Sequence, residues 1–285
     1  MKSKQMMPAG RPARIRGKCA AFLAALLAAL CLFSALPAAL GEGGEAVQPQ
    51  RTVYGASEQG RELVCWRVGP EDASRAFLMV FAVHGFEDRF ARDGLLLTQI
   101  ARCLLDHYAL HPEALGDTAL YIVPCANPDG LAEGSSNTGF GRCNALGLDI
   151  NRDFPEGWVR RGQSANRTGE APLSTAEARA LVGLAEEIRP DWACDVHGYV
   201  NTVKYGANKA LAAAFAGKNA LNTGIEKWQS GGMLSVWLDT VTAGAVLIEM
   251  PTPLKNGNVN VLKDGYTEEM AERLRAGLEA FLSAQ

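Results

Sequence analysis

The sequence predicts an α/β fold in which a central mixed, largely parallel sheet lies between two layers of helices, a three-layer α/β/α arrangement. Short apolar stretches that indicate strands alternate with segments in which apolar residues recur at helical spacing. Several of these stretches have no polar break, which is typical of strands covered by helices on both faces. The clearest are residues 76–83, 119–125, 192–196 and 245–248.

The N-terminal segment has the pattern of an export signal. Residues 1–18 carry six basic side chains and no acid, and residues 19–40 carry no charge. Small residues just before Glu42 allow cleavage there, which leaves a single domain over residues 42–285. An uncleaved anchor is the alternative, because residues 19–40 are long enough to span a bilayer. We therefore expect an exported protein that meets a membrane only if this segment is retained.

Charge argues against a nucleic-acid partner or an anionic membrane surface. The full chain has a net charge of −3; removal of residues 1–41 takes away six of 28 basic residues and none of 31 acidic ones, leaving −9.

Five cysteines remain after residue 41 without a C-x-x-C pair, so a zinc ribbon is not indicated. One disulfide can form after export, but its partners are not defined. We expect a monomer.

The stretch over 76–83 ends in the run HGFE, with His84 and Glu87 three residues apart. The carboxyl end of such a strand is where open α/β sheets usually place their chemistry. An imidazole nitrogen and a carboxylate oxygen that turn toward one point suit zinc. At this stage a hydrogen-bonded surface histidine is an equal alternative, because H-x-x-E is short and common.

Helices are predicted between and after the strands. Residues 93–108 carry apolar side chains on one face. The capping box Ser174-Thr175-Ala176-Glu177 predicts the start of another helix, and Thr267 is expected to cap the last one.

A loop between the second and third of these strands carries further candidates. The strand over 119–125 ends in a turn of sequence NPDG, and the run GRCNALGLDINRDFP then covers residues 141–155. Two arginines in this run, Arg142 and Arg152, suggest recognition of an anion or oxyanion near the metal. A solvated loop is the alternative.

The two later strands are also followed by candidate functional residues. His197 and a glycine follow the strand over 192–196, which repeats the arrangement at His84 and makes a third zinc ligand plausible. Two histidines and one glutamate leave a fourth position open for water, as a catalytic zinc requires. Glu249 directly follows the strand over 245–248, where an acid is costly unless it lies in a cleft or is paired.

Taken together, these residues make the chain resemble the zinc metallocarboxypeptidases of the carboxypeptidase A type. The resemblance is greatest to the short bacterial members of that family. These are murein peptide amidases and carboxypeptidases that trim cell-wall peptides. The likeness runs from about residue 54 to residue 251. It rests on ordered blocks, each weak alone but specific as a set: YGASEQGREL, VHGFE, NPDG, GRCNALGLDINRDFP, the lone histidine and VLIEMP.

The resemblance implies a metal site with one zinc ion per chain. His84, Glu87 and His197 match the three ligands, and Asp149 matches an acid that orients the first zinc histidine.

The resemblance also implies roles around the substrate. Glu249 matches the general base, and Arg142 matches the arginine that polarises the scissile carbonyl and steadies the oxyanion. Asn151 and Arg152 match the pair that grips the substrate's terminal carboxylate. By spacing, Trp228 takes the place of the substrate-capping tyrosine of the animal enzymes.

One further position departs from the family. The family often has asparagine where Asp153 stands, which adds negative charge near the carboxylate clamp. This departure bears on substrate preference more than on catalysis.

The implied activity is zinc-dependent hydrolysis of an amide bond next to a substrate carboxylate. The expected target is the γ-D-glutamyl–diaminopimelate bond of peptidoglycan stem peptides, because an exported bacterial-type enzyme most often meets such a carboxylate there. The alternatives are a general C-terminal metallocarboxypeptidase, an aspartoacylase-like deacylase and a non-catalytic cell-wall-binding relative. The export signal and the YGASEQGREL block argue against the deacylase, and the complete set of ligands and base argues against the non-catalytic relative.

Overall fold

The computed structural model describes residues 46–135, 139–217, 225–227 and 230–285. The predicted export signal and Trp228 lie outside these ranges. Within them, each helix is too short or too polar to cross a membrane. The five cysteines after residue 41 are all free thiols in this structure, so the disulfide left open by the sequence is not formed.

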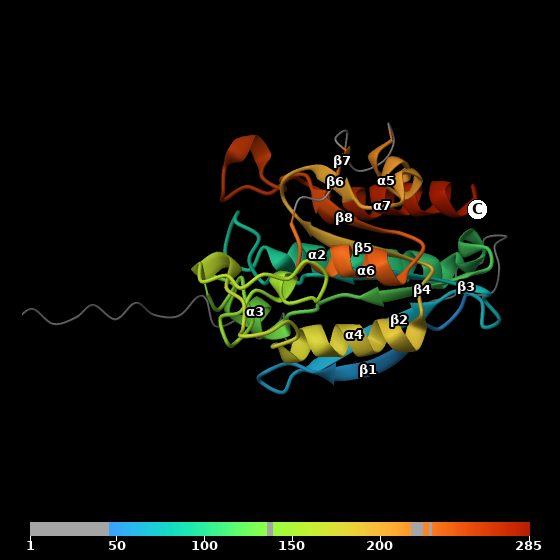
Figure 1. Ribbon diagram of the computed structural model, residues 1–285. Helices are drawn as coiled ribbons and strands as arrows, with labels where there is room; N and C mark the ends of the chain where they lie inside the picture. The colour runs from blue at the N-terminus through green and yellow to red at the C-terminus, as the bar shows by residue number, and fades with distance from the viewer. Residues whose placement is uncertain (1–45, 136–138, 218–224, 228–229) are drawn as a thin grey trace, which may run out of the picture. The chain divides into compact units, whose positions relative to one another are not determined.

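An eight-stranded sheet forms the middle of the domain, in the order β1-β2-β4-β3-β5-β8-β6-β7 (Figure 1). The four central strands, β4, β3, β5 and β8, are parallel, whereas β1, β2 and β6 pair antiparallel with a neighbour. The prediction of a mixed, largely parallel sheet is therefore confirmed. The strands are β1 (Gln50–Ala56), β2 (Glu62–Val68), β3 (Arg75–Phe81), β4 (Thr118–Val123), β5 (Trp192–Gly198), β6 (Thr202–Tyr205), β7 (Ile225–Lys227) and β8 (Ala245–Met250).

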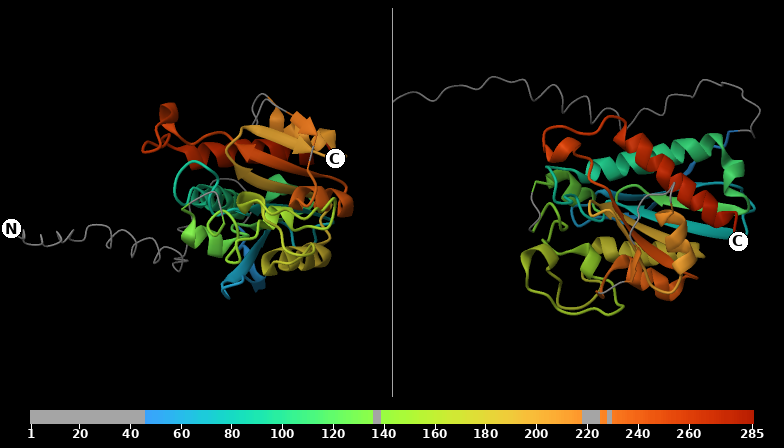
Figure 2. Two further views of the ribbon diagram at one scale, coloured as in Figure 1. Left: turned by 60° about the vertical axis from the view of Figure 1, so that its left-hand side comes forward. Right: turned by 90° about the horizontal axis from the view of Figure 1, so that it is seen from above.

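Helices cover both faces of this sheet, as the view from above in Figure 2 shows for α2 and α7 on one side and α4 and α6 on the other. The main helices are α2 (Gly94–Leu110), α3 (Pro128–Glu133), α4 (Ala176–Ile188), α5 (Lys209–Ala216), α6 (Leu234–Val241) and α7 (Tyr266–Leu282). Short 3₁₀ turns lie at η1 (Pro112–Leu115), η2 (Ile150–Arg152), η3 (Ser164–Asn166) and η4 (Lys255–Gly257).

Strand β3 shows why its sequence has no polar break. Phe77, Met79 and Phe81 pack into the core under α2, α5 and α7, while Leu78 and Val80 pack into the core under α4 and α6. Side chains of a strand alternate between its two faces, so a strand with a helical layer on each side must be apolar throughout.

Two helix caps differ from the prediction. Helix α4 is capped by Thr175 and not by Ser174: the Thr175 hydroxyl accepts from Ala178 N at 3.2 Å. The predicted partner Glu177 instead accepts hydrogen bonds from Glu58 N and from the side chain of Asn144. Thr267 lies inside α7, whose N-cap is a glycine without a side-chain cap. Tertiary partners replace the local bonds that the sequence pattern implies.

The YGASEQGREL block has a structural role. Asp129 at the start of α3 accepts from the Ser57 hydroxyl at 2.8 Å and from Gln59 N at 2.9 Å, and it pairs with Arg61. These contacts hold the turn between β1 and β2 against α3. The loop after β3 also approaches α3, and a Cβ on Gly85 would lie 2.1 Å from the backbone of this helix. The close backbone approach explains why a glycine follows His84.

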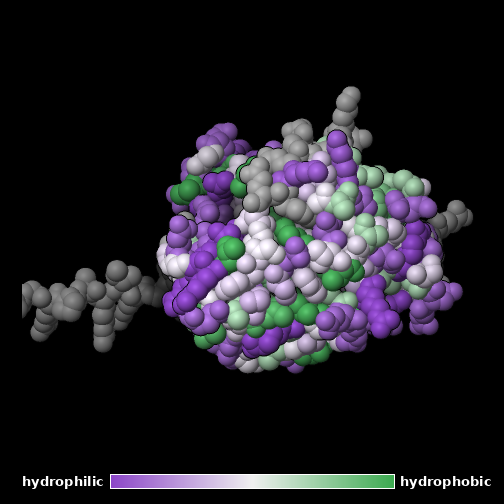
Figure 3. Space-filling view, in the orientation of Figure 1, coloured by the Kyte–Doolittle hydropathy of each residue, from purple (hydrophilic) through white to green (hydrophobic). Residues whose placement is uncertain are grey.

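The parallel register brings three strand ends to one edge. Val80 pairs with Asp195 across β3 and β5, and His197 pairs with Glu249 across β5 and β8. On the face shown in Figure 3, hydrophilic residues lie at both ends of the domain, and those at the left end lie over the loops that follow these strands. Candidate residues far apart in the sequence therefore meet at the carboxyl end of the sheet.

Candidate active site

Three predicted metal ligands converge at this edge. His84, Glu87 and His197 offer ligand atoms that all lie within 4.8 Å of one another, and this is the one such group found in the described ranges. The Glu87 carboxylate faces both rings, with 3.3 Å to His84 Nδ1 and 3.0 Å to His197 Nδ1. All three side chains are buried, with at most 4% of their surface exposed.

Each histidine has a buried carboxylate behind it. His84 Nε2 lies 2.9 Å from Asp149 Oδ1, as the sequence led us to expect. His197 Nε2 lies 2.8 Å from Asp195 Oδ1 and 3.1 Å from Asn151 Nδ2. A carboxylate that accepts the Nε2–H proton keeps the Nδ1 lone pair directed at the metal and makes the imidazole a stronger ligand.

The charges of the cluster fit a divalent cation. Burial alone would raise the pKa of Glu87, but the two histidines beside it hold this pKa at about 2. Burial would likewise raise the pKa of Asp149, which His84 and Arg142 bring well below its usual range. A metal ion requires neutral histidines, and the carboxylates of Glu87, Asp149 and Asp195 then exceed the guanidiniums of Arg142 and Arg152 by one charge, to which Glu249 adds when it is ionised.

A buried negative excess of this size is costly unless it is neutralised. Two imidazoles and one carboxylate are also an established donor set for zinc. The residues present therefore suit zinc in both charge and donor type.

Glu249 lies in β8 beside His197 and is half-buried. Burial raises the pKa of its carboxyl group to about 7, and the nearby Glu87 adds to this while His197 opposes it. A carboxyl group that titrates near neutral pH next to a metal site is suited to accept and return a proton.

Arg142 reaches the metal cluster from the loop after α3. Its Nη1 lies 3.7 Å from Glu87 Oε2, and its Nε donates to Ala165 O at 3.2 Å. Burial by itself would lower the pKa of Arg142, but Asp149, Glu87 and Asp88 raise it above the ordinary value. A charged guanidinium thus lies beside the ligands, where an oxyanion would develop.

Asn151 and Arg152 lie together in η2, next to His197. The Asn151 amide is turned toward the protein: its Nδ2 lies against His197 and its Oδ1 accepts from Leu234 N at 2.9 Å. Arg152 is half-buried, and its Nη1 donates to Asn151 O at 2.6 Å. The structure therefore brings the predicted carboxylate-binding pair to the metal cluster, with Arg152 as its charged member.

Asp153 does not add charge to this clamp, contrary to the expectation from the sequence. Its carboxylate accepts from Ser174 N at 3.1 Å and from Thr175 N at 2.7 Å and the Thr175 hydroxyl at 2.8 Å. It therefore faces the start of α4, where backbone N–H groups have no partner within the helix.

Two site residues were missed by the sequence analysis. Asp195 precedes His197 by two positions, and alternation along a strand places both side chains on one face, so the D-x-H spacing was an available signal. Asp93 accepts from Glu87 N at 2.6 Å and Arg89 N at 2.8 Å, which orients the loop that carries Glu87. No sequence pattern around Asp93 indicated this role, because its hydrogen-bond partners come together only when the loop folds.

Solved structures with the same fold include carboxypeptidase A from Helicoverpa armigera, with a TM-score of 0.64 at 16% identity over 83% of this chain and 69% of that one. The murein-tripeptide amidase from Escherichia coli O157 superimposes with a TM-score of 0.55 at 24% identity, covering 83% of this chain and 93% of that one.

Sequence relatives point the same way. Bacteriocin BCN5 from Clostridium perfringens is 34% identical over 78% of this chain, which spans only 25% of the bacteriocin's length. Murein peptide amidase A from Escherichia coli (strain K12) is 26% identical over 81% of this chain and 91% of its own length. The family profile described as zinc carboxypeptidase matches residues 46–227. The chain therefore belongs to the zinc carboxypeptidase family and is a hydrolase acting on peptide bonds.

Proposed function

We propose that this protein is an exported zinc peptidase that hydrolyses the γ-D-glutamyl–diaminopimelate bond of peptidoglycan stem peptides. The observation that carries the proposal is the half-buried guanidinium of Arg152, which interacts electrostatically with Asp149 behind His84 and follows Asn151 beside His197. A two-pronged cation is suited to a carboxylate next to the cleaved amide. The amidase relative that this chain matches over 91% of its length supports the murein substrate, and the basic and apolar N-terminus supports export.

In this proposal His84, Glu87 and His197 hold the zinc ion, with Asp149 and Asp195 orienting the two histidines. Zinc, when bound, supplies a Lewis acid that lowers the pKa of water and polarises a carbonyl. Glu249 accepts the proton of the attacking water and delivers it to the leaving amine.

The other residues of the site bind and orient the substrate. The Arg142 guanidinium donates to the carbonyl oxygen as negative charge develops on it. Arg152, placed by Asn151, binds the carboxylate of the diaminopimelate residue. The same clamp would also suit the C-terminal carboxylate of an ordinary peptide, so the substrate must be tested directly.

The decisive experiment offers the purified protein a murein tripeptide and a C-terminal hydrophobic dipeptide side by side, with and without a metal chelator. We expect the tripeptide to be cleaved faster, with release of diaminopimelate, and the chelator to stop the reaction. Hydrolysis of the dipeptide with the tripeptide untouched would make this an ordinary carboxypeptidase.

A further inference from the structure

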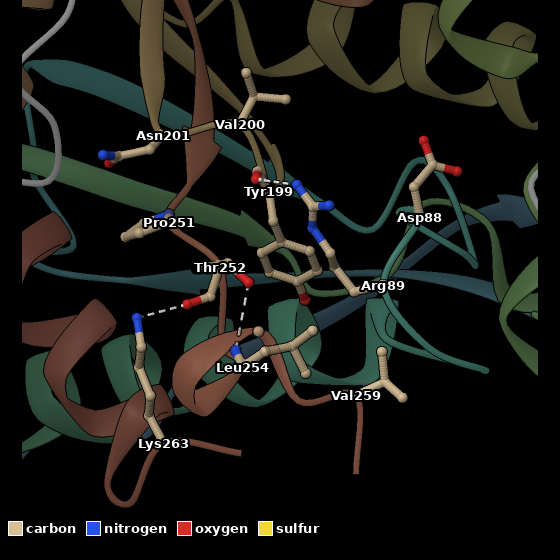
Figure 4. A pocket seen from close by; sticks show the side chains of 11 residues that line it. Asp88, Arg89, Tyr199, Val200, Asn201, Pro251, Thr252, Leu254, Val259 and Lys263 are labelled. Atoms are coloured by element: carbon tan, nitrogen blue, oxygen red, sulfur yellow. Dashed lines mark hydrogen bonds between the residues drawn. The ribbon is translucent and has the colours of Figure 1, made fainter. Parts of the chain in front are cut away.

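A pocket of about 630 Å³ is lined by the segments that follow Glu87, His197 and Glu249 in the chain, and it belongs to none of the roles assigned above (Figure 4). Its walls come from residues one or two positions after the metal ligands: Asp88 and Arg89 after Glu87, and Tyr199 after His197. The loop that follows β8 closes the other side, from Pro251 through Lys263. The pocket and the metal cluster are therefore built on the same chain segments.

The pocket and the carboxylate clamp lie over opposite faces of the sheet. Tyr199 belongs to the core on the α2 and α7 side, and its hydroxyl donates to Asp93 O, next to the start of α2. Asn151 accepts from Leu234 N of α6, and the flanking Ile150 packs into the core on the α4 and α6 side. A substrate whose amine part is held by Arg152 must therefore direct its acyl part across the strand ends, toward the pocket.

The pocket walls offer two cations and one acid, although the chain as a whole is acidic. Arg89 is exposed, and one of its terminal nitrogens donates to Tyr199 O at 2.8 Å, which holds the guanidinium at the wall. Lys263 is held by a hydrogen bond to Thr252 O at 2.8 Å. Asp88 lies at the opposite end of the lining from Lys263 in Figure 4.

Part of the remaining lining is apolar, beside the polar Asn201 and Thr252. Val200 and Val259 are large exposed hydrophobic residues, and Pro251 and Leu254 complete this side. The pocket thus combines fixed cations with an apolar wall, which suits an acidic group on a short, otherwise uncharged segment.

We propose that this pocket binds the acyl side of the substrate and that Arg89 recognises a carboxylate on the residue that contributes the scissile carbonyl. The inference rests on the proposed function, and it names a chemical feature of that substrate class. In a γ-linked glutamyl residue the scissile carbonyl belongs to the side chain, so its α-carboxylate remains free on the acyl side. An ordinary α-linked peptide has no such carboxylate next to the cleaved bond.

The test uses two murein tripeptides that differ only at this group, one with the glutamyl α-carboxylate free and one with it amidated as D-isoglutamine. A hydrogen bond between charged partners contributes roughly 1.5–3 kcal/mol, so we expect kcat/KM of the unmodified protein to be about 10- to 100-fold higher for the free acid. Arg89→Gln should remove most of this preference while activity on the amidated peptide stays within about threefold.

Lys255→Ala is the matched control, because Lys255 lies in the same loop but outside the pocket lining. It should keep the full preference for the free acid. Equal cleavage of both tripeptides by the unmodified protein, or a preference that survives Arg89→Gln, would overturn the inference and leave the murein activity standing. If neither tripeptide is cleaved but the hydrophobic dipeptide is, the proposed function itself fails and this inference falls with it.

Discussion

The metal cluster and the pocket share chain segments but are built in different ways. His197 and Glu249 lie within strands, are at least half-buried and are positioned by the register of β5 and β8. Arg89 and Lys263 are exposed and lie on loops, each held by one backbone carbonyl. Strand register defines positions that catalysis needs exactly, whereas loops vary without disturbing the sheet. His84 and Glu87 lie in the loop after β3, but they are buried and Asp93 holds that loop. The catalytic residues are therefore fixed by strand register and burial, whereas the pocket residues are exposed and free to vary.

The largest expected effect comes from the strand side of this comparison. Glu249→Gln is nearly isosteric and cannot accept a proton, so it should lower kcat by about 10²–10⁴-fold. Zinc content, measured on the same preparation, should stay at about one ion per chain. Ordinary activity in this variant would place the base elsewhere.

The pH profile tests the same residue without a substitution. Burial raises the pKa of Glu249 to about 7, so the carboxylate needed as base is lost as pH falls below that value. A bound dication favours the ionised form and can only lower this pKa. We therefore expect kcat/KM to fall on the acid side with a midpoint at or below about pH 7, and activity that rises as pH falls through this range would contradict the assignment.

Arg142→Ala comes next, because it removes a guanidinium beside the cluster without removing a ligand. Loss of one oxyanion donor costs about 10²–10³-fold in kcat. A change confined to KM would show that Arg142 contributes to ground-state binding and not to the transition state.

Asp195→Asn addresses the residue behind His197. The amide cannot stabilise the Nε2–H of the imidazole as a carboxylate does, so zinc affinity should fall about 10- to 100-fold in a competition titration with a chelator. Asp149→Asn should behave alike, because Asp149 contacts His84 in the same way. Zinc affinity unchanged in Asp195→Asn would show that His197 needs no carboxylate at this position.

The smallest effect on activity is expected for Asp153→Ala, which separates stability from substrate binding. Loss of the contacts to Ser174 and Thr175 should reduce the free energy of unfolding by about 1–3 kcal/mol in a denaturant titration. KM should not change, because the carboxylate faces α4 and not the clamp. A large rise in KM would return Asp153 to the substrate side.

The sequence by itself determined the sheet and the principal residues of the site. Residues 76–83 are apolar on both faces because helices cover both sides of β3. An unbroken apolar run in the sequence is sufficient to indicate such a buried strand. The H-x-x-E run and the later histidine marked a metal site because both follow buried strands, and parallel strands end at a shared edge. Composition and spacing were sufficient for the sheet and the metal site. Both depend on local apolar patterns and on the rule that parallel strands end at one edge of a sheet.

Only the tertiary structure decided how the remaining polar groups are used. Asp149 and Asp153 lie four positions apart in one turn, yet one faces His84 and the other faces the start of α4. Glu177 fits a local capping box but bonds instead to Glu58 and Asn144, which are distant in the sequence. A short polar side chain bonds to whatever the fold brings within about 3 Å, and that neighbourhood is set by long-range packing that no local pattern records.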